Sequence, residues 1–417
     1  MAGRHWCGVL ARPAAEPGRH IAVIGKVSVR PLYLVLCLLV AASRAAGAQD
    51  PQEPPRPAAS EKEASDRGWM AIAERWFDSE DDAVPRFTIV FGGIKSGSGA
   101  AGGPAVAYTF GDGSFVQARA EYSIHSYKLL QANYQSRSFE WLHAVVSTRV
   151  RWQDAPSVAL YDLGADASDL RALYAERKTE YSAQAELRPT SITRVVGGLG
   201  YEKYRVGNGR LDLEEDEHLT EIPPLPGLGA RPAFLHVFAA GAIDARPSGD
   251  VSRSGWRVDA AAHHFSDREQ GTYSFSRFVG EAEQLVPVAH DRGALGLVGT
   301  IWASTGNTVP FFLMPTLGGG DYLRGYRTYR FRDRDAVVLT AQFQWRLHEW
   351  VDGVAFVDVG RVAPELSALR LGASRPTEGV GVRVRTPKKT IFRFDLARSN
   401  EGLQWLIGFS ARTSAVF

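Results

Sequence analysis

The sequence is poor in cysteine and has no long apolar run. Its only two cysteines, Cys7 and Cys37, lie near the N-terminus of the 417-residue chain. No run of about 18 or more apolar residues occurs, so the sequence predicts no membrane-spanning helix. If the N-terminal segment is removed, no cysteine is left for thiol catalysis, a zinc–thiolate site or a disulfide.

That N-terminal segment has the pattern of an export signal. A short apolar core over residues 31–43 follows a basic stretch that ends at Lys26 and Arg30, and Ala46-Gly47-Ala48 offers a small-x-small cleavage site. Such a pattern is typical of a secretory signal peptide, which we predict over residues 1–48.

Two short segments follow the predicted signal peptide. Residues 49–66 are rich in Pro, Ala, Glu and Ser, which predicts a disordered linker. Residues 67–85 contain apolar side chains at helical spacing, which predicts one short amphipathic helix and lead-in. We expect no independently folded domain in so short a stretch.

From Phe87 onward the apolar period changes from that of a helix to that of a strand. Between Lys178 and Arg188, apolar and charged side chains alternate strictly, so one face is apolar and the other is charged. Sixteen such segments can be counted, most of roughly 9–14 residues, which suits tilted strands that cross a bilayer. Their connections alternate between short and long.

These features predict an all-β fold over residues 86–417: a 16-stranded antiparallel transmembrane β-barrel with a long loop folded into the lumen. A water-soluble sheet with one solvated face shows the same alternation. The even strand count, the alternating loop lengths, the export signal and the opposite charges within each polar face favour the outer-membrane barrel.

The longest connection contains the most distinctive motif. Gly318, Gly319 and Gly320 allow a sharp backbone turn. Beyond them, Arg324 lies between Leu323 and Gly325 and is followed by Tyr326. A cation on such a loop tip is expected to meet an anion elsewhere, and Asp358, in the apolar run 356–360, is the candidate because an unpaired buried charge is costly.

These motifs resemble those of the bacterial surface-antigen superfamily, the BamA/TamA-type assembly and translocation barrels, over roughly residues 86–417. Gly318 to Tyr326 is similar to the family's Arg-Gly-Phe/Tyr loop, and residues 356–360 are similar to its Phe-x-Asp-x-Gly strand. Residues 161–164 resemble its Tyr-Gly-Leu-Gly element, and residues 244–247 its Asp-Thr-Arg turn.

The resemblance implies that the loop folds into the lumen and that Arg324 pairs with acidic groups on the wall. Asp358 is the implied partner. Gln344 stands where the family has a second carboxylate, so we expect one anion rather than two beside Arg324. The resemblance also implies a weak seam between the first and last strands, which we place at Gly92, Gly93 and the terminal Phe417. No polypeptide-transport-associated domain is expected.

The sequence gives little support for catalysis, cation binding or phosphate binding. His263 to Asp267 brings His, Ser and Asp together in sequence, but their side chains diverge along a strand, so we expect no catalytic triad and no enzyme. The acidic run from Asp212 to Glu221 suits a solvated loop better than a cation site. The segment from Gly92 to Gly103, with Lys95, lacks the order of a phosphate-binding loop. We predict no metal, no cofactor and no nucleic-acid partner.

The sequence therefore predicts an outer-membrane protein that assists the insertion or translocation of polypeptide through a weak seam. The alternative is a passive pore or transporter that retains the family barrel. The expected partners are outer-membrane lipid, together with unfolded outer-membrane polypeptides or a separate periplasmic partner.

Overall fold

The computed structural model describes most of the predicted barrel. All the described residues belong to one compact unit, Ala59–Phe417. They are residues 86–139, 144–209, 224–247, 251–289, 292–306, 308–370, 374–386, 389–408 and 415–416. The predicted signal peptide, linker and helix, and the acidic run from Asp212 to Glu221, lie outside them. No helix among the described residues is long and apolar enough to cross a membrane.

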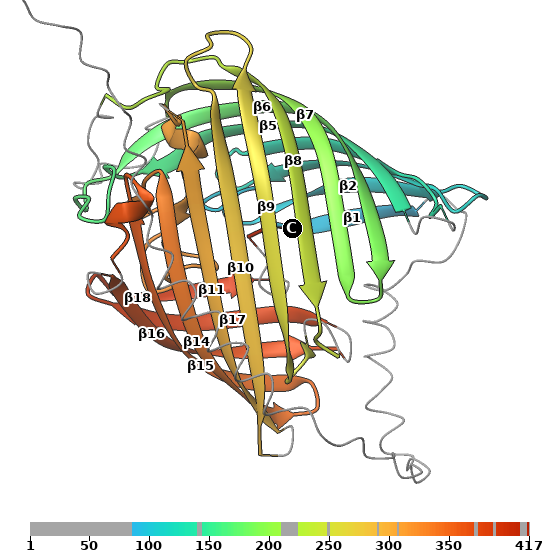
Figure 1. Cartoon of the computed structure of the whole chain (residues 1–417), viewed down its shortest axis with the longest axis vertical. Helices are drawn as coiled ribbons and strands as arrows, with labels where there is room; N and C mark the ends of the chain where they lie inside the picture. The colour runs from blue at the N-terminus through green and yellow to red at the C-terminus, as the bar shows by residue number, and fades with distance from the viewer. Residues whose placement is uncertain are drawn as a thin grey trace, which may run out of the picture. The chain divides into compact units, whose positions relative to one another are not determined.

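The main element is a 16-stranded sheet in which each strand pairs antiparallel with the next one along the chain. Its strands are β1 (Arg86–Gly92), β2 (Ala101–Thr109), β3 (Phe115–Ser123), β4 (Lys128–Gln135), β5 (Ala144–Leu160), β6 (Ala172–Thr190), β7 (Thr193–Asn208), β8 (Ala233–Asp244), β9 (Gly255–Asp267), β10 (Phe275–Val288), β11 (Gly293–Thr305), β14 (Asp335–His348), β15 (Val351–Ala363), β16 (Arg375–Arg385), β17 (Thr390–Ser399) and β18 (Gly402–Gly408). Figure 1 shows the long tilted strands of its central part side by side. The predicted all-β transmembrane barrel with sixteen strands is confirmed.

The alternation in the sequence has a direct structural reason. On β6, the apolar Tyr181 points outward and is 52% exposed. Its neighbours Lys178 and Glu180 point into the lumen, where their side chains form an ion pair of 2.9 Å. The outer face of the strand is therefore suited to lipid, and the charges are neutralised inside.

One strand is longer than the sequence indicated. The alternation pattern in the sequence predicts a long connection over residues 152–171, but β5 continues to Leu160 and has 17 residues. Its register with β6 shifts between Ala155 and Val158, beside Pro156. An irregularity of this kind interrupts the period-2 pattern, which explains why the end of β5 was not recognised.

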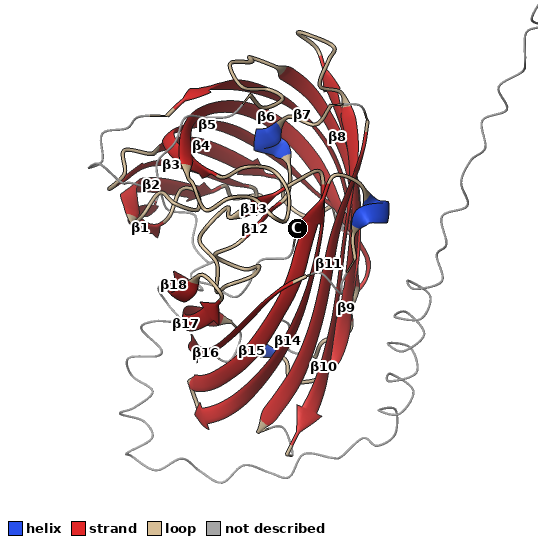
Figure 2. Cartoon of the chain, turned by 90° about the vertical axis from the view of Figure 1, so that its left-hand side faces the viewer, coloured by secondary structure: helices blue, strands red, loops and turns tan. Residues whose placement is uncertain are grey.

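The connection between β11 and β14, residues 306–334, is the lumen loop. It contains a short 3-10 helix (Phe311–Leu313) and a two-stranded sheet of β12 (Thr316–Leu317) and β13 (Phe331–Arg332). Figure 2 shows β12 and β13 within the curve of the large sheet, as the sequence predicted for a loop folded inward.

Two apolar clusters hold the lumen loop in place. In the first, Phe311 and Phe312 pack with aromatic side chains of β6, β7 and β8, Tyr174, Tyr204 and Phe234. In the second, buried side chains of the loop pack against β14 and β15: Leu317, Leu323, Tyr326 and Phe331 against Val338 and Val362. The loop is therefore part of the core.

The sheet ends at β1 and β18. Among the described residues, no pairing joins these two strands. The described part of β18 ends at Gly408. Each strand carries exposed apolar side chains: Phe87, Ile89 and Phe91 on β1, and Leu403, Trp405 and Ile407 on β18.

Candidate functional site

The glycine motif forms a compact turn inside the lumen. Gly318, Gly319 and Gly320 all have positive φ angles, of 111°, 71° and 56°. A Cβ at Gly318 would overlap the carbonyl oxygen of Arg327, so no other residue fits there. Leu323, although not glycine, is also left-handed, with a φ of 51°. The turn presents the next residue, Arg324, to the wall.

The guanidinium of Arg324 binds the carboxylate of Asp358 on β15 through two of its nitrogens, Nε and Nη2. Nε donates to Oδ2 at 2.9 Å and Nη2 donates to Oδ1 at 2.8 Å, and the Arg324 backbone N–H adds a bond of 3.2 Å to Oδ2. Two parallel N–H···O bonds of this kind are the strongest form of an arginine–carboxylate pair. The structure thus brings together the two residues that the sequence paired.

The Asp358 carboxylate is fully buried and has further partners. The hydroxyl of Thr340 on β14 donates to Oδ1 at 3.0 Å, and that of Thr377 on β16 lies 3.4 Å from Oδ2. The guanidinium carbon of Arg324 lies 3.3 Å from the ring centroid of Phe356. Ion pairing, hydroxyl donors and an aromatic face together satisfy charges that would otherwise be costly to bury.

A second carboxylate lies beside Arg324, and this corrects the sequence prediction of a single anion. Asp395 of β17 is 3.7 Å from Nη1 of Arg324, and Arg383 of β16 pairs with Asp395 at 2.7 Å. Two guanidinium groups and two carboxylates therefore meet, and we call Arg324, Phe356, Asp358, Arg383 and Asp395 the Arg324 cluster.

Glycines on β16 make room for the Arg324 cluster. A Cβ at Gly379 would overlap the Phe356 ring, and a Cβ at Gly381 would overlap the carboxylate of Asp395. Side chains from β15 and β17 can therefore meet across β16. The sequence showed the aspartate on the lumen face of its strand but gave no sign of this gap.

Gln344 does not face Arg324. Its amide nitrogen donates to Oδ2 of Asp352 at 2.6 Å. Asp352 begins β15, at the opposite end of that strand from the lumen loop, so the expectation that Gln344 is a partner of Arg324 is wrong.

The lumen loop is also bonded to the final hairpin, which consists of β17, β18 and the turn at residues 400–401. The Tyr326 hydroxyl donates to Oδ1 of Asn400 at 2.7 Å, and Nε of Arg330 donates to Glu401 at 2.7 Å. The Ser399 hydroxyl donates to the Gly325 carbonyl at 2.7 Å. In addition, Asp321 forms an ion pair with Arg393 of β17.

Gly325 allows this close approach. A Cβ on Gly325 would come within 2.6 Å of the Arg398 carbonyl oxygen, so a side chain at this position would push the loop away from β17. This explains in physical terms why a glycine follows the arginine.

At the other end of the sheet, the predicted seam glycines are placed as follows. Gly92 is the last residue of β1, and Gly93 begins the connection to β2. A Cβ at Gly92 would meet nothing within 4 Å, so space does not require glycine there. The register of β2 with β3 skips Gly103 and Pro104, which leaves this edge weakly paired. Phe417 lies outside the described residues.

The connection between β1 and β2 turns inward. Ile94 is buried in the same apolar cluster as Phe311, and Lys95 forms an ion pair of 2.8 Å with Glu176 of β6. Burial by itself would lower the pKa of Lys95, but Tyr174 and Glu176 outweigh it and raise the pKa, with a contribution from Tyr329 of the lumen loop. The glycine-rich segment is therefore a structural anchor near that loop.

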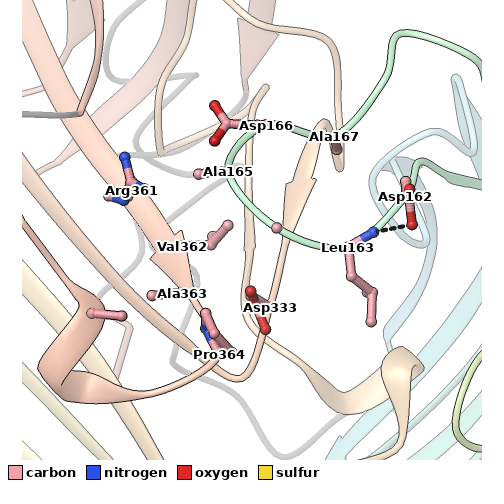
Figure 3. Close-up of a pocket in the computed structure, with 12 residues that line it drawn as sticks. Asp162, Leu163, Ala165, Asp166, Ala167, Asp333, Arg361, Val362, Ala363 and Pro364 are labelled. Atoms are coloured by element: carbon pink, nitrogen blue, oxygen red, sulfur yellow. Dashed lines mark hydrogen bonds between the residues drawn. The ribbon is translucent and has the colours of Figure 1, made fainter.

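Other motifs from the sequence have structural roles. The backbone N–H of Gly164 donates to the Arg332 carbonyl, which joins segment 161–164 to the lumen loop. This segment borders a cavity of about 340 Å³ with Asp333 and the end of β15 (Figure 3). Arg246 bonds Asp244 within its turn and Glu283 on β10.

The His263–Asp267 stretch does not form a triad. His263 lies 3.0 Å from His236, and His264 lies 2.9 Å from Ser276. The carboxylate of Asp267 instead accepts backbone N–H groups of Glu269, Gln270 and Tyr273.

The comparisons with known proteins agree with this architecture. The model of the Omp85 superfamily domain matches residues 109–410. A crystal structure of BamA from Haemophilus ducreyi lacking POTRA domains 1–3 aligns with a TM-score of 0.60 at 13% identity, covering 78% of this chain and 70% of that one. CdiB from Escherichia coli aligns with a TM-score of 0.53 at 12% identity, covering 78% of this chain and 62% of that one. No curated protein matches the sequence.

Proposed function

Because the chain belongs to the Omp85 superfamily, we propose that it assists the insertion of proteins into the bacterial outer membrane, or the translocation of polypeptide, through the seam between β1 and β18. It is an outer-membrane β-barrel protein. Among the described residues, β1 and β18 are the two ends of the sheet, and an edge strand offers backbone groups that can pair with an added strand.

The observation that supports this proposal is the attachment of the lumen loop to both sides of the seam. On one side, Tyr326 and Arg330 bind the turn of the final hairpin. On the other side, Ile94, in the connection that follows β1, packs in the same apolar cluster as Phe311 and Tyr329 of the lumen loop. The position of the lumen loop is thus coupled to the position of both edge strands.

We propose that the Arg324 cluster holds the lumen loop in the position that keeps the seam closed. It ties the lumen loop to β15 directly and to β16 and β17 through Asp395 and Arg383. Buried, fully paired charges favour one discrete arrangement of the loop. Release of Arg324 would detach the lumen loop from Asp358 and Asp395, after which the loop and the final hairpin that it binds could move together away from β1.

The test is a covalent lock across the seam. Thr88→Cys on β1 and Gln404→Cys on β18 are joined by bifunctional maleimides of graded length, and the assembly of outer-membrane proteins is followed in cells. The matched control joins Ala341→Cys and Val357→Cys, which are already register partners on β14 and β15. We expect the seam lock to abolish assembly and the control to leave it intact; normal assembly in locked cells rejects the proposal.

A passive pore is the second candidate, favoured by the charged lumen wall. Lys178 of β6 pairs with Glu180 and, at 3.0 Å, with Glu202 of β7. Such groups would set ion selectivity if the lumen conducts. Recordings from the purified protein in planar bilayers distinguish the two functions, because a large steady conductance is expected only of the pore.

A further inference from the structure

We propose that the lumen-facing cluster of Arg253, Asp352 and Arg385 binds a small oxyanion such as phosphate. Arg253 lies in the connection between β8 and β9, and the other two residues lie on β15 and β16. Nη2 of Arg253 donates to Oδ1 of Asp352 at 2.7 Å, and Nε of Arg385 donates to Oδ2 at 2.9 Å. This cluster is separate from the Arg324 cluster.

The charges of this cluster are not balanced. Asp352 is fully buried, and its two oxygens receive both arginines and the amide of Gln344. Among the described residues, Arg253 and Arg385 thus share a single carboxylate, which leaves an excess of one positive charge. An excess of positive charge in a water-poor site favours the binding of an anion.

An unused donor marks where that anion would bind. Arg253 is only 8% exposed, and its Nη1 is buried without a hydrogen-bond partner among the described residues. A buried polar group without a partner is costly, the more so when it is charged. Because a guanidinium presents its N–H groups as a rigid fork, an oxyanion beside Nη1 would satisfy the orphan donor while Nη2 stays on Asp352.

The backbone holds Arg253 in this position. Gly255 has a φ of 100°, and a Cβ there would come within 2.5 Å of the Ala245 carbonyl oxygen. A glycine is therefore needed to close the turn between β8 and β9. This turn lies at the same end of the barrel as the two-residue connection between β14 and β15, which is the periplasmic end by the rule that periplasmic turns are short. The site would take its anion from that side.

The degree of burial favours a small ligand. Arg253 and Asp352 are only 8% and 0% exposed, so only a small ligand would reach Nη1 of Arg253, and the net positive charge of the cluster disfavours metal cations. The shared chemistry is that of an oxyanion, and separate titrations with inorganic phosphate and with acetate identify which is preferred.

The experiment measures the thermal unfolding of the purified barrel in detergent, and the change in electrophoretic mobility reports unfolding. The ionic strength is held fixed, and chloride is the reference salt. A ligand that binds the folded state raises the midpoint. We expect phosphate or acetate to raise it for the wild type. We expect Arg253→Gln to weaken binding on the order of tenfold or more, because a charge-assisted bond is lost.

Two further variants separate anion binding from a purely structural role. Asp352→Asn removes the competing carboxylate, so it should bind the anion more tightly even though the barrel itself becomes less stable. Arg257→Gln breaks another buried arginine–aspartate pair, with Asp259 on β9, and should keep the wild-type response. An unchanged response in Arg253→Gln, a weaker one in Asp352→Asn, or no response in the wild type overturns the proposal.

Discussion

Substitution of Arg324 by alanine should release the lumen loop while the barrel stays folded. In the wild type, the Asp358 carboxylate accepts three N–H bonds from Arg324 and is fully buried. After truncation, its remaining donors among the described residues would be the backbone N–H of residue 324 and the hydroxyls of Thr340 and Thr377. Removal of one partner of a buried ion pair costs about 3–5 kcal/mol, which shifts the docking equilibrium of the loop by roughly 10²- to 10⁴-fold.

A double-mutant cycle tests this reasoning. Arg324→Ala with Asp358→Ala removes both charges, so the double variant should be more stable than the sum of the two single losses predicts, by an interaction energy of about 0.5–3 kcal/mol. Arg324→Lys should be intermediate, because it keeps the charge but loses the fork geometry.

The assay is limited proteolysis of the lumen loop in intact barrels, combined with the thermal midpoint of the barrel. Arg324→Ala should be cleaved between residues 306 and 334 much faster than the wild type, with no comparable loss in the midpoint. If the effects of the two single variants are strictly additive, the pair does not interact and the Arg324 cluster does not hold the loop.

Three further predictions concern the surroundings of the cluster. Tyr326→Phe removes the bond to Asn400 and should lower the stability of the docked loop by about 0.5–1.5 kcal/mol, measured by the same proteolysis. Gly381→Val should displace Asp395, which a Cβ would overlap, and should lower the unfolding midpoint more than Gly381→Ala does. Burial raises the pKa of Asp333, so ionisation of this carboxyl opposes folding. Asp333→Asn should therefore raise the thermal unfolding midpoint at pH 7. This gain should vanish below about pH 4, where the carboxyl is protonated in the unfolded chain as well.

The strands and the main contact of the lumen loop could be predicted from the sequence because both follow local rules. Alternation of side chains defines each strand, and glycines around Arg324 define a tight turn that presents a cation. Asp358 was identifiable because it is an acidic residue within an otherwise apolar strand, where a buried charge needs a partner.

The other features of the site depend on how neighbouring strands pack, and a single sequence does not reveal this packing. The approach of Asp395 to Arg324 requires the space left by glycines on β16, and this becomes visible only when three strands are placed in register. Gln344 lies on the predicted strand but closer to its other end, so its partner is Asp352. The irregular end of β5 was hidden because its register shifts.

The bonds between the lumen loop and the final hairpin have a mechanical consequence. On β18, the described contacts of the loop reach only the turn that precedes it, through Asn400 and Glu401, whereas β17 is also gripped lower down, at Arg393. Over its described length, β18 is held by its pairing with β17, from Gly402 opposite Ser399 to Gly408 opposite Arg393. Among the described residues, a movement of the lumen loop would therefore reach β18 directly at its outer turn, and lower down only through β17.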